Sequence, residues 1–398
     1  MNGKSFVRWV MALGLIIGLW VVPAGAQNNP PVVSNVTAAQ RDDGSKLVDI
    51  TYDLDDADGD SCTVWAVVSD NAGVTFRVPA FTFSGDVGPS ITPGNGRQIV
   101  WDAGADIPGA ILTSAVVRVY ADDGNGPAPM VVVEGGYFEM GDSFGEGNTD
   151  ELPVHTVWVS TFLIDKHEVT NAFYAQFLNA GGNDDHWDAN QHINRSGDKG
   201  NYYYLAEPGY EDHPVVYVSW DDATAFCDWR SAAEGFPLGT YRLPTEAEWE
   251  KAAGWDPILY RQFRFGEHTD GCGYNCLDGQ RANYAGSGDP FGSGTTPVGY
   301  YDGTDHDGAY QTQNAPSYYE AYDMSGDVWE WCYDWYSSTY YGSSDPSDPT
   351  GPESGSSRVV RGGSWAHSPQ DCRSANRFVD SPGNRVAFTG FRVASGTP

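Results

Sequence analysis

The alternation of apolar and polar positions predicts short strands between residues 28 and 126. In segment 47–52, Val48, Ile50 and Tyr52 alternate with Asp49 and Thr51, which is the period of a strand with one buried face. Turn-forming residues separate this run from its neighbours. The other β-prone runs are 32–33, 63–68, 74–78, 98–101 and 115–120. About six or seven such strands favour an antiparallel β-sandwich.

Beyond residue 128 the pattern predicts three capped helices among aromatic-rich loops and short strands. Thr170 is placed to cap a helix that runs through Leu178. Ser219 is placed to cap a second helix. The segment Thr245–Glu248 has the spacing of a capping box, and Gly254 is placed to end that helix.

The chain divides into three predicted segments. Residues 1–26 have the layout of a secretory signal, in which Lys4 and Arg8 precede an apolar run and Ala24-Gly25-Ala26 provides a cleavage site. A membrane anchor is the alternative interpretation of the same run. Residues 28–126 form the β-sandwich module, and a Gly- and Pro-containing linker leads to a second domain at 128–396. We expect a secreted or periplasmic protein with no transmembrane segment after signal removal.

Charge narrows the range of partners. The chain has 22 basic and 54 acidic residues, a formal net charge of -32. Nucleic acid is excluded as a partner because binding its phosphates needs clustered Lys and Arg. The acidic run Asp53–Asp60 is interpreted either as a calcium-binding turn or as a solvated acidic turn.

Six cysteines are present, and an exported protein is able to form disulfides. The loop Gly271–Cys276 holds Cys272 and Cys276, for which we predict a small local disulfide. A zinc pair is the alternative, but no second pair of Cys or His stands at a suitable spacing. The pairing of the other cysteines stays open.

Several segments of the second domain are distinctive sequence motifs. They are Val133–Gly141, Glu151–His155, Lys166–Asn171, His213–Trp220, Tyr241–Glu250, Tyr322–Trp331, Arg361–Trp365 and Gly390–Arg392. In this order they resemble the formylglycine-generating enzyme family, also called sulfatase-modifying factor domains. The resemblance covers about two thirds of the chain, from Met130 to Ala394, and leaves the first module outside. That module is similar only in pattern to immunoglobulin-like or fibronectin type III modules.

The resemblance implies an α+β fold with little regular secondary structure, related to C-type lectin-like domains. Family enzymes oxidise a sulfatase cysteine to formylglycine, using oxygen and a copper(I) ion held by two cysteines. Copper(I) is a soft ion that prefers thiolates.

The chain departs from the family at the copper-binding positions. The first family cysteine, three positions after Ser364, is replaced by His367, and the second aligns with Cys372. Ser364, His367 and Cys372 are therefore the candidate catalytic residues. The alternatives are a structural Ser364 in a tight turn, an exposed loop histidine, and a structural thiol or half of a disulfide at Cys372. Phe388 and Thr389 stand where the family has a substrate-region Asn.

The resemblance also implies two structural calcium sites. The first maps onto Asn283, Tyr284, Asp289 and Phe291, and the second onto Ser325, Gly326, Val328 and Glu330. Carboxylate and carbonyl oxygens are the ligands that calcium takes. For Glu330, a salt bridge or hydrogen bonds from the protein are the alternative to calcium.

Two functional classes remain open. The first is a calcium-stabilised, non-catalytic binding module for a protein, peptide or glycan. The second is a divergent copper-dependent oxidase of a protein or small thiol. Outside the motifs, His186 and His192 are interpreted as residues of a solvated polar loop.

Overall fold

A computed structural model describes residues 31–70, 78, 80, 82–109, 115–122, 129–181, 183–234, 236–255, 277–306 and 310–396. The predicted signal segment, nearly all of the predicted linker, and Cys272 and Cys276 with their disulfide lie outside these residues. Among the residues that are described, none of the helices has the length and apolar character needed to cross a bilayer.

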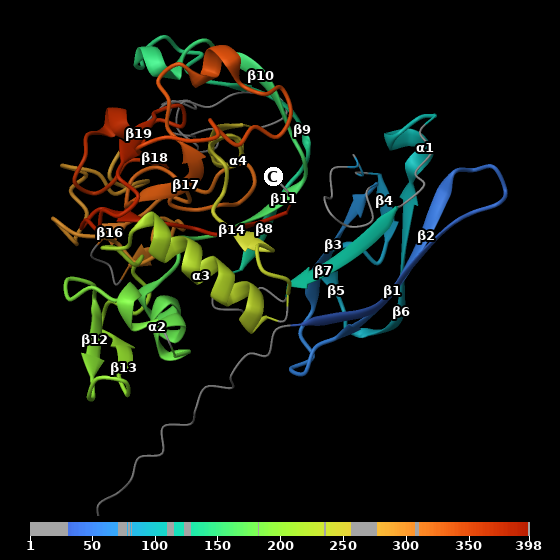
Figure 1. Ribbon diagram of the computed structural model, residues 1–398, viewed down its shortest axis with the longest axis horizontal. Coiled ribbons are helices and arrows are strands. Elements are labelled where there is room, and N and C mark those ends of the chain that lie inside the picture. The colour runs from blue at the N-terminus through green and yellow to red at the C-terminus, as the bar shows by residue number, and fades with distance from the viewer. Residues whose placement is uncertain are drawn as a thin grey trace, which may run out of the picture.

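All the strand pairs in the described residues of the first module are antiparallel. One sheet has the order β1-β2-β6-β4, and the other has the order β5-β3-β7. The strands are β1 (Val32–Gln40), β2 (Leu47–Asp55), β3 (Cys62–Ser69), β4 (Phe83–Gly85), β5 (Gly88–Ile91), β6 (Gly94–Asp102) and β7 (Val116–Asp122), and helix α1 (Ala103–Asp106) follows β6. Figure 1 shows this unit in blue and teal beside the remaining elements.

Both sheets of the module contribute to one core. Ile50, Tyr52 and Leu54 of β2 are buried and pack in the same cluster as Val64 of β3 and Trp101 of β6. The alternation in β2 is therefore confirmed, because Asp53 and Asp55, between and beyond these positions, are less buried. The described residues of this unit thus form two antiparallel sheets around one core, and its assignment as an immunoglobulin-like or fibronectin type III sandwich stays a prediction.

The second unit is a mixed domain with short elements, as the α+β prediction requires. Its helices are α2 (Asn171–Asn179), α3 (Trp220–Ala233) and α4 (Glu246–Gly254). Its strands are β8 (Met130–Val133), β9 (Gly136–Met140), β10 (His155–Val159), β11 (Phe162–Asp165), β12 (Ile193–Ser196), β13 (Tyr203–Ala206), β14 (Tyr241–Arg242), β15 (Asp305–His306), β16 (Tyr310–Gln311), β17 (Trp329–Trp335), β18 (Arg358–Arg361), β19 (Phe378–Asp380), β20 (Thr389–Gly390) and β21 (Ala394–Ser395). Single 3₁₀ turns are η1 (Thr149–Glu151), η2 (Asp184–His186), η3 (Tyr340–Ser343) and η4 (Pro369–Cys372).

The three predicted helix starts are confirmed. The Thr170 side chain accepts from the Phe173 amide, and Ser219 forms a capping box with Asp222. Thr245 and Glu248 form the predicted capping box, in which each side chain satisfies the other residue's backbone amide. α4 ends at Gly254 as expected.

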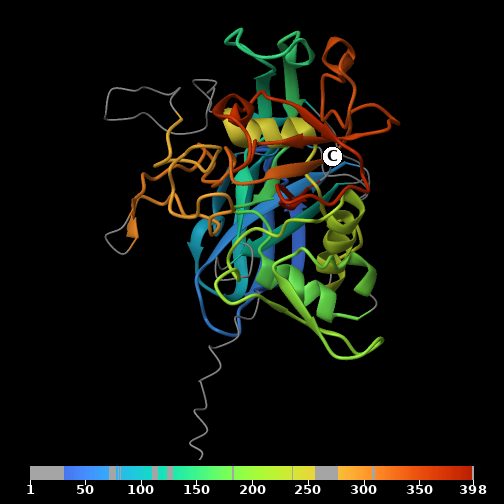
Figure 2. The ribbon, with the colours of Figure 1, turned by 90° about the vertical axis from the view of Figure 1, so that its left-hand side faces the viewer.

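Two four-stranded sheets organise the domain. One has the order β14-β21-β11-β8, so that residues 394–395 lie between strands from residues 162–165 and 241–242. The other has the order β19-β18-β17-β20. Figure 2 shows helices α2 and α3 on one side of the domain and the orange loops around residues 277–316 on the other.

Candidate functional site

Charged residues within the motifs and near them form buried ion pairs. In the six shortest of the fully buried pairs, every side chain is at most 9% exposed and the two charged atoms lie within 2.8 Å. The pairs are Arg230–Asp165, Arg242–Glu248, Arg361–Glu250, Arg373–Glu151, Arg377–Glu246 and Arg392–Glu330. A buried charge is tolerated only when it is paired and hydrogen-bonded, so each of these charges requires its partner.

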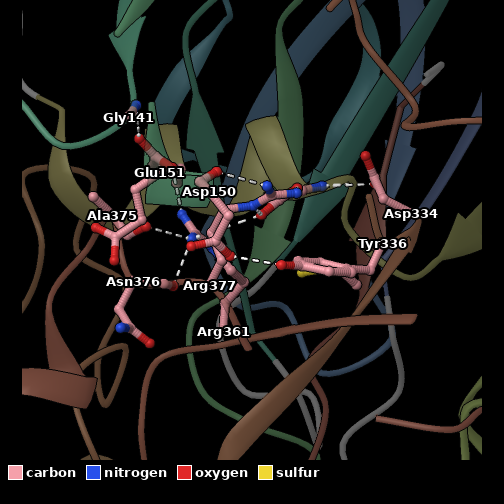
Figure 3. Close-up of polar contacts among 12 residues, drawn as sticks. Gly141, Asp150, Glu151, Asp334, Tyr336, Arg361, Ala375, Asn376 and Arg377 are labelled. Atoms are coloured by element: carbon pink, nitrogen blue, oxygen red, sulfur yellow. Dashed lines mark hydrogen bonds and ion pairs between the residues drawn. The ribbon is translucent and has the colours of Figure 1, made fainter. Parts of the chain in front are cut away.

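Arg377 and Arg361 lie at the centre of the part of this network drawn in Figure 3. Arg377 donates to both oxygens of Glu246, at 2.7 and 2.8 Å, and to the Asp150 carbonyl at 2.8 Å. Arg361 donates to Glu250 and to the carbonyls of Ser374, Ala375 and Asn376. These contacts fix segment 374–377 against helix α4 and identify the RLPTEAEWE and RGGSW motifs as structural.

Glu330, the predicted calcium ligand, is held by protein donors. Arg392 donates to its two oxygens at 2.7 and 2.8 Å, and Trp249 Nε1 donates to Oε2 at 2.8 Å. The charge of this carboxylate is therefore already neutralised, as in the salt-bridge alternative. The Glu330 side chain does not fit a calcium ligand in this arrangement.

The backbone of the second predicted calcium site forms a tight turn. Gly326 has a φ of +84°, and a Cβ atom there would lie 2.1 Å from the Asn283 carbonyl oxygen, so only glycine fits. Ser325 Oγ donates to the Cys372 carbonyl at 2.8 Å, and Val328 is fully buried. The turn thus joins the two predicted calcium segments and the candidate catalytic loop.

The residues of the first predicted calcium site adjoin this turn. Asn283 Nδ2 donates to the Gly294 carbonyl at 2.9 Å and to Asp327 Oδ1 at 3.0 Å. Asn283 Oδ1 has no hydrogen-bond partner among the described residues. Asp289 accepts from the Phe291 amide at 2.8 Å and from Ser287, so its carboxylate is turned toward its own loop. Tyr284, whose carbonyl the resemblance implies as a ligand together with that of Phe291, packs beside the cluster that contains Cys372.

A group of buried acids beside this turn was not predicted. Neither oxygen of Glu168 has a hydrogen-bond partner within the described part of the chain, and the nearest cation, Arg392, is 3.7 Å away. Burial and then the charge of Asp323 raise the pKa of Glu168 well above its ordinary value. The same two causes raise the pKa of Asp327. The sequence feature that could have indicated this group is the presence of acidic residues inside the motifs Lys166–Asn171 and Tyr322–Trp331.

His367 and Ser364 are in contact, as members of one site would be. Ser364 Oγ and His367 Nδ1 are 2.6 Å apart, and Trp329 Nε1 donates to the same Nδ1 at 3.2 Å. Because an indole N–H only donates, Nδ1 carries the lone pair and Ser364 donates to it as well. Burial lowers the pKa of His367, whose half-buried ring packs against Trp329 and Phe388.

Cys372 lies in a different environment. It is fully buried and packs with Ala282, Tyr300, Tyr301 and Ala315. Its Sγ is 3.7 Å from the Ser368 carbonyl. A Cβ atom at Gly363, which has a φ of +79°, would lie 2.6 Å from Cys372 Sγ, so glycine is required there. No disulfide joins the cysteines within the described residues, and all four of them are buried.

The side chains of His367 and Cys372 are not arranged to bind a soft metal ion together. His367 presents an Nδ1 that two protein donors already occupy, and the Cys372 thiol faces an apolar cluster. In the part of the chain that the structure describes, no three His, Cys, Asp or Glu side chains are grouped so as to hold a metal ion by themselves. The donor set therefore does not fit copper(I) bound by paired thiolates.

A cleft of about 610 Å³ lies beside this loop. Its walls come from loops 190–192, 209–217 and 291–295, together with Trp365 and Ala387. His192, interpreted from the sequence as a solvated loop residue, lies here and stacks on Tyr210 with ring centroids 3.7 Å apart. His186 instead contacts Asp222 at 2.9 Å. A ligand that enters the cleft would lie close to Ser364, because the lining includes the next residue, Trp365.

Comparison with known proteins assigns the second domain. A family model described as sulfatase-modifying factor enzyme 1-like domain matches residues 119–397. A formylglycine-generating enzyme of Streptomyces coelicolor is 34% identical over 309 residues, covering 67% of this chain and 88% of that protein. The solved structure of PvdO from Pseudomonas aeruginosa matches with a TM-score of 0.51 and 28% identity, over 67% of this chain and 94% of that one.

A third similar protein is named as a protein kinase and not as a formylglycine-generating enzyme. The serine/threonine-protein kinase Pkn1 of Chlamydia trachomatis is 37% identical over 274 residues, but the match covers 67% of this chain and only 38% of that protein. Proteins that are named for different functions thus match the same part of this chain, so the match shows the family and not the activity. On the match over residues 119–397, this chain belongs to the sulfatase-modifying factor family, which includes the formylglycine-generating enzymes.

Proposed function

We propose that this protein is an exported, non-catalytic binding module of the formylglycine-generating enzyme family. The observation that carries the proposal is the state of His367, which replaces the first family cysteine. Its Nδ1 is engaged by Ser364 and Trp329, and its ring is packed between aromatic side chains. A side chain held in this way stabilises its loop. Because it stands in place of a cysteine, the chain lacks the pair of thiolates on which the family chemistry depends.

The cleft beside Trp365 is the proposed binding site. Its lining includes two exposed aromatic side chains, Tyr210 and Phe291, each of which is 37% exposed. The loops that form it are anchored by buried contacts, such as that of Asn171 Nδ2 with the His213 carbonyl at 3.1 Å. A pocket held by the scaffold binds a ligand with little ordering cost.

An assay for oxidase activity tests the proposal directly. The purified protein is incubated with copper(I), oxygen and a cysteine-containing sulfatase peptide, while oxygen consumption is followed and the peptide is analysed by mass spectrometry for formylglycine. We expect no aldehyde, and the same background for the wild type and Cys372→Ala. Aldehyde formation that is lost in Cys372→Ala would refute the proposal and establish the oxidase instead.

The second part of the proposal is a bound calcium ion, held by a set of side chains that differs from the one the resemblance implies. Both carboxylate oxygens of Glu168, Oδ2 of Asp327 and the amide oxygen of Asn283 have no hydrogen-bond partner in the described residues. Backbone carbonyls would complete the shell, which is usual for calcium. Such an ion would neutralise buried charge that Arg392, at 3.7 Å, neutralises only in part. A calcium-dependent rise in the melting temperature is the direct measurement.

Export is the third part of the proposal, and it is carried by residues 1–26, which have the layout of a secretory signal. Expression of the full chain with a C-terminal tag, followed by cell fractionation and N-terminal sequencing, tests it. We expect the mature protein outside the cytoplasm, with its N-terminus at Gln27. An uncleaved protein in the cytoplasm would contradict export.

A further inference from the structure

The cleft beside Trp365 has an uncharged lining. Among the described residues that form its walls there is no Lys, Arg, Asp or Glu, although the whole chain has a net charge of -32. The lining instead offers aromatic rings from Tyr210, Tyr217, Phe291 and Trp365, and neutral polar groups from Ser293 and other short side chains. A site for an ionic ligand would need a compensating charge, so the lining selects a neutral one.

The two histidines in the walls do not change this conclusion. His213 is 3% exposed, and its Nδ1 is 2.9 Å from Thr295 Oγ1. Burial lowers the pKa of His213 to about 4, so the ring is neutral at physiological pH. The His192 ring contacts the Glu207 carboxylate at 2.8 Å, so any charge on it is balanced by a residue outside the lining.

The backbone at Tyr217 is held in an unusual conformation. Tyr217 has a φ of +56°, in the left-handed region that aromatic residues seldom adopt. Its amide donates to the Val386 carbonyl at 2.9 Å, and its carbonyl accepts from Gln191 Nε2 at 3.2 Å. A strained residue that the surroundings fix from both sides is typical of a ligand site, and Tyr217 is one of the cleft residues.

We propose that this cleft binds a neutral sugar ring, as the end or a branch of an uncharged glycan. A pyranose has an apolar C–H face that packs on aromatic rings and a rim of hydroxyls that pair with neutral polar groups. The exposed rings of Tyr210 and Phe291 provide the packing surface, and Asn190, Ser293 and Thr295 provide the polar rim. This inference rests on the proposed non-catalytic function and names its ligand class.

An extended peptide fits the same cleft less well. Peptides that bind in extended form usually pair with an exposed strand edge. All the lining residues lie in loops, outside the strands of the described structure. The cleft therefore offers no ladder of backbone donors and acceptors, whereas side-chain recognition of a ring needs none.

Saturation-transfer difference NMR tests the proposal. The full-length mature protein is mixed in turn with the methyl glycosides of glucose, galactose, mannose and N-acetylglucosamine. We expect transfer to the ring protons of at least one glycoside. Tyr210→Ala and Phe291→Ala should each weaken that binding by at least about tenfold, because aromatic residues at the centre of a site dominate its affinity.

Tyr203→Ala is the matched control, because Tyr203 is an exposed tyrosine of strand β13 that is absent from the lining. It should bind the glycoside as the wild type does. No transfer to any of the four glycosides with folded wild-type protein would overturn the inference. Binding that survives both Tyr210→Ala and Phe291→Ala would also overturn it.

A neutral peptide library forms the second arm. If a peptide binds in a Tyr210-dependent way and no glycoside does, the sugar assignment fails while the non-catalytic function stands. If the oxidase assay is positive, the non-catalytic function fails whatever the glycosides do. The two failures are therefore distinguishable.

Discussion

Arg392 forms a bidentate ion pair with the carboxylate of Glu330, in which Nε lies 2.7 Å from one oxygen and Nη2 lies 2.8 Å from the other. Both side chains are fully buried. Arg392 also donates to the carbonyls of Asp165 and Tyr322, so one guanidinium joins three segments that are distant in sequence. The pair is therefore a structural junction of the domain, where family resemblance had placed a metal ligand.

Replacing Glu330 by Gln should strongly destabilise the domain. The change keeps the shape but leaves Arg392 as a buried charge without its full partner, which costs about 3–5 kcal/mol. Chemical denaturation of wild type and Glu330→Gln measures the loss. Asp49→Asn is the control, because the Arg41–Asp49 pair is exposed and screened by water, and it should change little. Equal losses in the two variants would contradict the structural role of Glu330.

His367 should be a neutral imidazole protonated on Nε2. Its pKa is lowered by burial, and Nδ1 faces the indole N–H of Trp329, which is unable to accept a hydrogen bond. Long-range proton–nitrogen NMR at neutral pH distinguishes the two ring nitrogens. Trp329→Phe, checked for folding by circular dichroism, removes that donor and should allow both tautomers. A wild-type spectrum with a protonated Nδ1 would be incompatible with this geometry.

Asp222 should stabilise the protein at neutral pH but not in acid. Burial raises its pKa, but the hydrogen bonds from His186 and Arg385 outweigh burial, so that the pKa lies below the ordinary 3.8. A carboxyl whose folded-state pKa is lowered adds stability above its unfolded pKa and loses it as the pH falls through the folded value. Asp222→Asn should therefore cost about 1–3 kcal/mol at pH 7, with the difference disappearing below about pH 4.

Urea denaturation of both proteins across this pH range tests the prediction. Asp228→Asn is the matched control, since Asp228 lies on the exposed face of the same helix α3. Its effect should be small at every pH. A loss in Asp222→Asn that stays constant down to strongly acidic pH would show that the ionised carboxylate is not the cause.

Glu168 should make the domain responsive to calcium. In calcium-free buffer Glu168→Gln should raise the melting temperature, because it removes a carboxylate whose oxygens have no hydrogen bonds in the described structure. In millimolar calcium the wild type should gain stability by ligand binding and Glu168→Gln should not. Glu353→Gln, at an exposed position, should respond to calcium like the wild type. A wild type indifferent to calcium would dispose of the proposed site.

Local features of this domain were predictable because their partners lie close in sequence. Thr245 and Glu248 are three residues apart, so their spacing alone predicted the capping box. The same holds for β2, in which Ile50 and Tyr52 alternate with polar neighbours. The motifs of the second domain also led to the correct family and the correct fold class.

The site was harder to predict because its contacts are long-range. Glu246 and Arg377 are separated by 131 residues, and no local period reports such a pair. Glu330 has no cationic neighbour in its own motif, and the side chain that neutralises it, Arg392, lies 62 residues away. The acids at Glu168 and Asp323 were missed for the same reason, since their proximity exists only in the folded chain.

Strand β21 has a consequence for biosynthesis. Its two residues pair with β11 on one side and β14 on the other, so neither neighbour has its complete set of backbone partners before residue 395 has been translated. Nascent chains of this domain must therefore leave the ribosome with a gap in a central sheet. A stalled or shortened product would expose that gap to other nascent strands, and quality control would meet it as an aggregation-prone intermediate.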